Sequence, residues 1–189
     1  MMGAVNTRTG RPTAEQLEAA RDTVIPDVIA PDLKVLFCGI NPGLWSGAVG
    51  LHFARPGNRF WPALYASGFT PEPLTPQRQG ELPALGLGIS NVVARATAKA
   101  EELSRDELRE GARLLADKAE RYRPRWIAIV GITAYRTAFT RPGAQIGRQD
   151  EPIGESRVWV LPNPSGLNAR WTAQTLGEEF GRCRAAAMG

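Results

Sequence analysis

The sequence predicts a three-layer α/β/α sandwich with a short, mainly parallel central sheet. Four short segments are continuously apolar rather than alternating, which is typical of parallel strands that helices cover on both faces. Helical patterns lie between these segments, and strands that alternate with helices along a chain build a mixed α/β domain. The four predicted strands are residues 34–40, 86–93, 125–132 and 157–161.

The clearest predicted helix covers residues 105–122. Ser104 and Glu107 match a capping box at its start, apolar residues recur every three or four positions, and Pro124 ends it. Further helices are expected at residues 13–21, 59–67, 133–139 and 171–187, and loops at residues 70–83 and 141–156. Residues 1–12 are expected to form a disordered leader, and residues 13–189 a single domain.

The composition of the 189 residues excludes several kinds of chemistry. A single His and two Cys cannot supply a usual four-ligand zinc site or a disulfide framework, so we expect no metal, no cofactor and a reduced, cytoplasmic protein. No apolar run approaches the roughly 18 residues that span a bilayer, so no membrane partner is expected. Only three of the 23 basic side chains are Lys, and the net charge is +4. The charge fits a polyanionic partner and the excess of Arg favours contacts with phosphates, but a codon bias that replaces Lys with Arg explains this excess equally well.

Unusual turn residues follow each predicted strand. They are residues 39–43 (GINPG), 90–91 (SN), 131–133 (GIT) and 162–167 (PNPSGL). Ligands of parallel sheets bind beyond the carboxyl ends of the strands, so these turns mark the expected site. Two of them contain Asn-Pro, a rigid pair that holds an amide side chain in a fixed place. Asn-Pro is also an ordinary turn former, but two such pairs at strand ends of one small domain favour a functional role.

These motifs are specific enough to name a family. The stretch FCGINPGL at residues 37–44, with GLHFARPGNRFW at 50–61, closely resembles the first motif of the mismatch-specific uracil-DNA glycosylases, the bacterial relatives of thymine-DNA glycosylase. WVLPNPSGL at residues 159–167 is similar to their second motif, and the resemblance runs from about residue 31 to 180. It implies a uracil-DNA glycosylase fold, a flipped base in a pocket at the strand ends, and hydrolysis of the N-glycosidic bond without a metal.

The resemblance implies two catalytic amides. Asn41 takes the position of the water-orienting residue, and Asn163 would donate to the pyrimidine as negative charge gathers on it. An amide accepts a hydrogen bond from water but cannot take its proton, so Asn41 predicts a slow catalyst. The alternative for both residues is a turn-capping amide in a packed loop.

The base pocket follows from the same motifs. The resemblance places Phe53 under the flipped base, with backbone N–H groups near Ile40 and Phe53 reading the edge of the base. Gly43 stands where strict uracil enzymes carry a bulky aromatic residue, so the pocket should admit 5-substituted and adducted pyrimidines. Asn91 could pair with O4 and N3–H of uracil, or it could simply cap the end of a strand.

The expected DNA-binding residues lie in the two motifs and beside them. Leu167 is the proposed wedge, an apolar tip that fills the gap left by the flipped nucleotide. Its neighbours Gly166 and Asn168 could contact the widowed guanine, and Ala169 stands where relatives often carry Arg. The remaining predicted contacts are Ser46, Arg55, Arg59, Ser165 and Arg170, each Arg being equally well explained as a solvated surface residue.

Ala94 is a departure from the family pattern, because many relatives have Asp at this point. If that Asp activates water, this chain is impaired, naturally or by engineering. If the Asp only caps a helix, its loss costs about 1 kcal/mol of stability. We take the catalytic role as the hypothesis, because Asn41 is a poor base.

The leading functional hypothesis is a monomeric, monofunctional glycosylase that acts on G·U mismatches in double-stranded DNA. None of Lys34, Lys99 and Lys118 lies in a motif, so no amine is expected to form a Schiff base and cut the strand. One alternative is a broader uracil-DNA glycosylase that also accepts single strands, which Asn91 favours. Another is a damage-binding protein with weak catalysis, which Ala94 favours. A hydrolase with Ser165 as nucleophile is the weakest hypothesis, because His52 has no obvious acid partner.

Overall fold

The computed structural model describes residues 10–189, which are built around a five-stranded sheet. The strands are β1 (Val35–Gly39), β2 (Leu87–Asn91), β3 (Trp126–Val130), β4 (Gly147–Ile153) and β5 (Ser156–Leu161). Their order across the sheet is β2-β1-β3-β5-β4. The first four strands in this order are parallel, and β4 pairs antiparallel with β5 at one edge.

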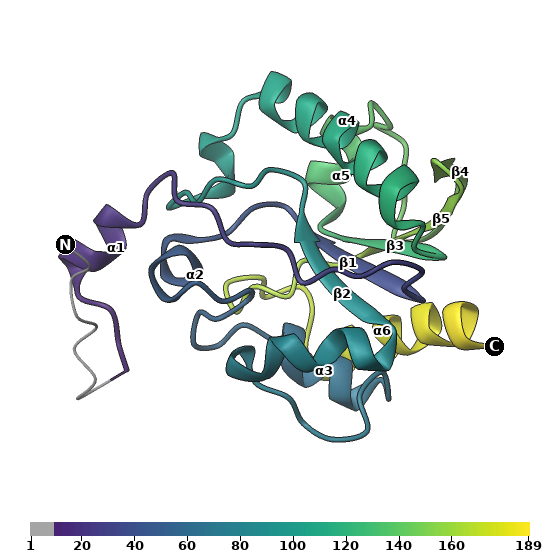
Figure 1. Cartoon of the computed structure of the whole chain (residues 1–189), viewed down its shortest axis with the longest axis horizontal. Helices are drawn as coiled ribbons and strands as arrows, with labels where there is room; N and C mark the ends of the chain where they lie inside the picture. Colours follow the sequence, from purple (N-terminus) through teal and green to yellow (C-terminus); the bar gives the residue numbers. More distant parts are fainter. Residues whose placement is uncertain (1–9) are drawn as a thin grey trace.

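Helices cover both faces of this sheet, as Figure 1 shows. They are α1 (Ala14–Ala19), α2 (Leu44–Val49), α3 (Phe60–Ala66), α4 (Arg105–Tyr122), α5 (Ile132–Ala138) and α6 (Ala173–Met188), with 3₁₀ turns η1 (Pro76–Leu85) and η2 (Ala100–Glu102). Helices α4 and α5 lie on one face, and α3 and α6 on the other. The predicted three-layer α/β/α class is therefore confirmed.

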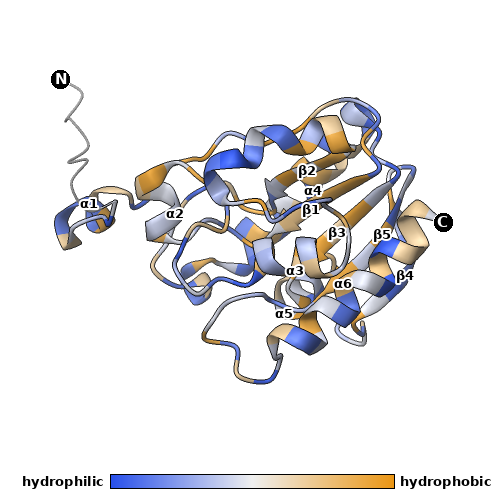
Figure 2. Cartoon of the chain, turned by 90° about the horizontal axis from the view of Figure 1, so that it is seen from below, coloured by the Kyte–Doolittle hydropathy of each residue, from blue (hydrophilic) through white to orange (hydrophobic). Residues whose placement is uncertain are grey.

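The core is divided by the sheet because successive side chains of a strand point to opposite faces. Leu36 and Cys38 of β1 pack in the cluster that includes α4 and α5, whereas Val35 and Phe37 pack in the cluster with α3 and α6. All five residues of β1 are buried, so it reads as a continuous apolar run. Figure 2 shows the largely apolar strands in the middle of the molecule, surrounded by helices that mix hydrophilic and hydrophobic residues.

The predicted elements agree with the structure to within one or two residues at their ends, and α4 has the predicted bounds. The Ser104–Glu107 capping box is present at its start. Four elements were not predicted. Strand β4 lies in the expected loop 141–156, and η1 overlaps the expected loop 70–83. The short α2 lies between the strand-end turn and the next motif, and η2 lies just before α4. The expected leader, residues 1–12, lies outside the described residues except for residues 10–12.

Strand β4 escapes prediction for a physical reason. Its sequence, GRQDEPI, is mostly exposed, contains Pro152 and shows no apolar alternation. It is a strand because the edge of β5 offers it backbone partners, with a register shift between Gln149 and Ile153. Such pairing depends on tertiary contact rather than on local propensity. Within residues 10–189, no helix is both long enough and apolar enough to cross a membrane.

Candidate active site

A cavity of about 560 Å³ opens where the parallel strands end. Four neighbouring strands each deliver a wall residue: Asn91 ends β2, Asn41 follows β1, Val130 ends β3 and Asn163 follows β5. This position obeys the rule that ligands of parallel sheets bind beyond the carboxyl ends. Of the predicted site residues, the cavity wall contains Ile40, Asn41, Gly43, Ser46, Phe53, Arg55, Asn91, Asn163 and Ser165.

The amide of Asn41 is held by its nitrogen. Nδ2 donates to the carbonyl of Arg95 (3.0 Å) and to Oγ1 of Thr97 (2.7 Å). The Thr97 hydroxyl gives its own proton to the carbonyl of Lys99 at 2.8 Å, so only a lone pair can face Asn41. Both neighbours are therefore acceptors, which fixes the amide orientation. Across residues 10–189 no hydrogen bond uses Oδ1 of Asn41, and this oxygen is available to accept a bond from water.

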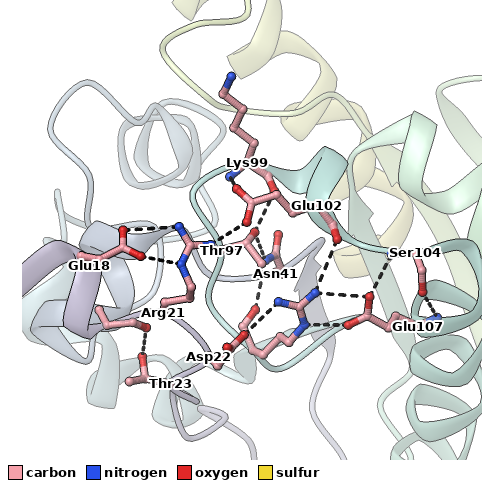
Figure 3. A network of polar contacts seen from close by, with 12 residues as sticks. Glu18, Arg21, Asp22, Thr23, Asn41, Thr97, Lys99, Glu102, Ser104 and Glu107 are labelled. Atoms are coloured by element: carbon pink, nitrogen blue, oxygen red, sulfur yellow. Dashed lines mark hydrogen bonds and ion pairs between the residues drawn. The ribbon is translucent and has the colours of Figure 1, made fainter.

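An ion-pair network supports the segment that holds Asn41, as Figure 3 shows. The guanidinium of Arg95 pairs with Glu107 at 2.6 Å and with Asp22 at 2.9 Å, and Arg21 reaches Glu102 at 2.7 Å. The hydrogen bond from Arg95 lowers the pKa of the Glu107 carboxyl to about 2. The network thus connects the region before β1 and the start of α4 to Arg95, whose backbone carbonyl accepts the hydrogen bond from Asn41.

The amide of Asn163 is held the other way round. The side-chain Oδ1 accepts a hydrogen bond from the backbone N–H of Ser165 at 2.9 Å. The backbone carbonyl of Asn163 accepts a hydrogen bond from Nδ2 of Asn168 at 3.1 Å. A backbone N–H can only donate, so the oxygen must face Ser165 and the nitrogen is left over. No hydrogen bond in the described part of the chain uses Nδ2 of Asn163. The cavity therefore meets an amide oxygen on Asn41 and an amide nitrogen on Asn163.

Phe53 is held in a strained backbone conformation at the cavity wall. Its φ is +52°, a left-handed value that costs a residue with a side chain about 1–3 kcal/mol. Hydrogen bonds of the residues on either side of Phe53 stabilise this conformation. The N–H of His52 donates to Gln79 Oε1 (2.9 Å), the carbonyl of His52 accepts Nε1 of Trp61 (3.1 Å), and the N–H of Ala54 donates to Ser46 Oγ (3.1 Å).

The side chain of Phe53 lines the cavity. One face of the ring stacks on Phe60, with ring centroids 4.0 Å apart and planes inclined by 19°. A flat ligand can therefore stack on the other face. Gly39 makes this arrangement possible, because a Cβ there would lie 2.7 Å from Asn91 Oδ1 and 3.2 Å from Phe53 Cζ. A Cβ on Gly43 would meet no atom within 4 Å, so the wall is open at that point.

The loop after β5 presents Leu167 to solvent on a rigid turn. Leu167 is 77% exposed. The N–H of Leu167 donates to Ser165 Oγ (3.3 Å), and the N–H of Asn168 donates to the carbonyl of Ser165 (3.0 Å). Gly166 packs against the backbone of Gly57, where a Cβ would come within 2.7 Å of the carbonyl oxygen. An exposed apolar tip on such a stiff loop fits the predicted wedge.

Two predicted DNA contacts have other partners. The guanidinium of Arg59 donates to the carbonyls of Ser165 and Asn168, each at 3.0 Å, and to that of Trp171. It therefore clamps the Leu167 loop. Ser46 is 5% exposed, and its hydroxyl accepts from Ala54, so it supports the Phe53 turn. Both side chains therefore support neighbouring loops of the protein, and their roles as DNA contacts remain predictions. Arg55 and Arg170 are exposed and remain predicted phosphate contacts.

The structure places Ala94 away from the cavity. Ala94 is exposed and lines a separate groove with Val92, Glu107, Glu110 and other residues at the start of α4. A carboxylate at position 94 would join the acidic side chains of that groove rather than face Asn41. This placement removes the geometric basis for treating Ala94 as a missing catalytic group.

Sequence reasoning missed several residues of the cavity wall. Arg11 lies over the ring of Trp45, 5.8 Å from its centroid, although residue 11 fell in the expected leader. Thr97 and His52 also line the wall. The signal for His52 was its place inside the first motif, next to Phe53. For Thr97 and Arg11 the sequence offered no signal, because tertiary contact alone brings them there.

Comparison with known proteins gives a family match and structural matches. Residues 26–185 match the family model described as the uracil DNA glycosylase superfamily. Among solved structures, the chain is similar to the solution NMR structure of a candidate uracil DNA glycosylase from Methanosarcina acetivorans, with 20% sequence identity and a TM-score of 0.59. That match covers 84% of this chain and 93% of the other. At this identity the structural match shows a shared fold, and the family match covers most of the chain.

Proposed function

We propose that this chain, which belongs to the uracil DNA glycosylase superfamily, acts on uracil in G·U-type mismatches of double-stranded DNA. Membership of the superfamily makes it a DNA N-glycosylase in general terms. The proposal adds that the enzyme flips the mispaired pyrimidine into the cavity, hydrolyses the N-glycosidic bond and leaves an abasic site. Related pyrimidines are further substrates.

The opposite orientation of the two Asn amides carries this proposal. Breaking the N-glycosidic bond builds positive charge on the deoxyribose and negative charge on the leaving pyrimidine. The free Oδ1 of Asn41 can accept from a water that attacks the sugar, and the free Nδ2 of Asn163 can donate to the pyrimidine. The other end of each amide is hydrogen-bonded within the protein, so neither side chain has to reorient during the reaction.

The rest of the cavity supports a base pocket of broad tolerance. The open face of Phe53 offers a stacking surface worth about 1–3 kcal/mol per base. Backbone N–H groups near Ile40 and Phe53 would read the edge of the base. The open wall at Gly43 leaves room for substituents at the 5 position of the ring. Discrimination then depends partly on how readily a mispaired base leaves the stack, with Leu167 filling the gap.

The mechanism is hydrolytic and slow. In residues 10–189 neither a carboxylate nor a Lys lines the cavity. Without a carboxylate the water is oriented but not deprotonated by a side chain, and without an amine no Schiff base forms with the sugar. We therefore expect a monofunctional enzyme, and borohydride should trap no covalent adduct with DNA.

A panel of oligonucleotides tests the proposal. Uracil opposite guanine, uracil opposite adenine and single-stranded uracil are incubated with excess enzyme, and abasic product is measured by alkaline cleavage. We expect the fastest release from G·U. Equal rates on all three would support the broader uracil-DNA glycosylase, the alternative that Asn91 favours. Tight binding to G·U duplex with no release from any substrate would contradict the proposal and select a damage-binding protein.

A further inference from the structure

His52 is the only histidine of the chain, and its two ring nitrogens contact two different partners. The side chain is buried, with 2% of the residue exposed. Nε2 lies 2.9 Å from the carbonyl oxygen of Pro26, and Nδ1 lies 3.3 Å from Nδ2 of Asn91. A carbonyl oxygen can only accept a hydrogen bond, so Nε2 must carry a proton.

The ring is neutral near pH 7. Burial lowers the pKa of His52 below its ordinary value of 6.5, against a smaller opposing effect of the Pro26 carbonyl. The charged groups that act on the ring are Asp27 and Lys118. These two form an ion pair with each other at 2.5 Å, and their effects on the ring have opposite signs. With Nε2 protonated and the ring neutral, Nδ1 presents a lone pair.

This lone pair determines how the Asn91 amide is turned. Nδ2 of Asn91 must donate one N–H to Nδ1, which places Oδ1 beside Gly39 and the ring of Phe53. The reversed amide would set Oδ1 against the Nδ1 lone pair and lose the hydrogen bond. Asn91 lines the same cavity as Phe53, so a base stacked on Phe53 would meet Oδ1 and the second N–H of the Asn91 amide.

An amide in this orientation fits one pyrimidine edge and not the other. Uracil offers a donor at N3–H and an acceptor at O4, which match the Asn91 oxygen and its second N–H. Cytosine offers an acceptor at N3 and a donor at its 4-amino group, and it would pair with the reversed amide. At both positions the donor of one base is replaced by an acceptor of the other, or the reverse. The orientation of the single Asn91 amide therefore determines which of the two bases can form both hydrogen bonds.

We propose that His52 is a positioning residue that locks the Asn91 amide in the orientation that pairs with uracil and rejects cytosine. The inference rests on the proposed function, because it assumes that a pyrimidine occupies the cavity. The lock runs from the Pro26 carbonyl through both nitrogens of the ring to the amide. His52 itself needs no contact with the base.

The hydrogen-bond chain can be tested without any activity measurement. Because the chain has one histidine, ¹⁵N-histidine labelling of the untagged protein gives the NMR signals of a single imidazole. We expect a protonated Nε2 and an unprotonated Nδ1 at pH 7, with a titration midpoint below 6.5. A protonated Nδ1 at pH 7 would overturn the inference, whether or not the protein is a glycosylase.

The effect on specificity is tested with His52→Gln. A Gln side chain can donate or accept, so both orientations of the Asn91 amide become available. We compare release of 5-fluorouracil and 5-fluorocytosine, each placed opposite an abasic analogue so that neither base is paired. Fluorine makes both bases better leaving groups, so that loss of the cytosine analogue can be measured. We expect the ratio of the two rates to fall by about tenfold, the usual effect of one lost hydrogen bond.

Two controls separate positioning from a structural role. In an Asn91→Ala background, adding His52→Gln should leave the ratio unchanged, because the amide through which His52 acts is gone. In the wild type, the ratio of the 5-fluorouracil rate to the 5-fluorocytosine rate should fall at pH values below the titration midpoint of His52, because Nδ1 then becomes a donor. The His52→Gln variant should show no such pH dependence. Equal losses on both substrates, with the ratio unchanged, would overturn the lock. If the wild type releases neither base, the proposed function fails, and the NMR result alone decides the hydrogen-bond chain.

Discussion

The two Asn-Pro turns of this protein have the same dipeptide at the ends of two parallel strands, yet they present opposite groups to the cavity. After β1, Asn41 uses its amide nitrogen to bind the carbonyl of Arg95 and Thr97, and leaves its oxygen. After β5, Asn163 uses its amide oxygen to bind the N–H of Ser165, and leaves its nitrogen. The dipeptide fixes where each amide lies, and the neighbouring groups decide which end of it faces a substrate.

This difference shows how one residue type can do two opposite tasks. An amide has a donor end and an acceptor end, and in solution either can face a ligand. In the fold, one partner that only accepts and one that only donates remove this freedom. The cavity wall gains one uncharged acceptor and one uncharged donor, which would suit the proposed reaction because that reaction separates charge between sugar and base.

The largest predicted effect is at Asn41. Asn41→Ala should slow uracil release in single turnover by about 10³-fold, because water is no longer oriented toward the sugar. Binding to a duplex with an abasic analogue, measured by fluorescence anisotropy, should stay within about threefold. A rate within tenfold of the wild type would show that Asn41 does not orient the attacking water.

The variant Asn41→Asp tests the difference between the two Asn residues through its effect on protein stability. The carboxylate would face the Arg95 carbonyl, and two acceptors would meet where a donor now lies. We expect a loss of about 1–3 kcal/mol in the free energy of unfolding, measured by urea denaturation. Asn163→Asp is the matched control, because either carboxylate oxygen can still accept the Ser165 N–H and stability should hold.

The second effect is at Asn163 and concerns the base. Asn163→Ala removes a donor to the developing anion and should slow release by about 10²-fold. Asn163→Asp should be slower than Asn163→Ala, because it places negative charge where the pyrimidine becomes negative. The two variants are compared in single turnover on the same G·U duplex. An Asp variant faster than the Ala variant would mean that Asn163 does not donate to the base.

Much of this site could be predicted from the sequence, because strand ends and turn residues are local features. The two Asn-Pro turns, Phe53 and Asn91 were all expected near one another, and the cavity wall contains them. The orientation of the amides could not be predicted. It depends on Thr97 and on the carbonyl of Arg95, which lie more than 50 residues from Asn41 along the chain.

The limits of prediction in the fold have a similar origin. Apolar periodicity and capping residues located the buried strands and the bounds of α4. Strand β4 was missed because its exposed, charged sequence carries no local strand signal and depends on β5 for pairing. The loop contacts of Arg59 could not be predicted for the same reason, since only the folded loop shows that its guanidinium binds backbone carbonyls.

The next prediction concerns Leu167, which lies in the same loop after β5 as Asn163. Leu167→Ala should slow release from G·U duplex by about tenfold, because the shortened side chain no longer fills the gap in the stack. Single-stranded uracil needs no wedge, so its release should change by less than about twofold. An equal loss on both substrates would assign Leu167 to packing instead. The exposed Leu114→Ala, on α4, is a control of the same chemistry away from the cavity.

The smallest predicted effect is at Ala94, next to the residue whose carbonyl holds Asn41. The sequence alone suggested that an Asp there would restore lost catalysis. The structure instead places position 94 in an exposed groove beside Glu107 and Glu110, outside the cavity wall. Ala94→Asp should therefore leave uracil release in single turnover within about twofold, since an exposed carboxylate there is screened by solvent. A large gain in rate would mean that a carboxylate can reach the water on Asn41, and that amide orientation alone does not explain the chemistry of this site.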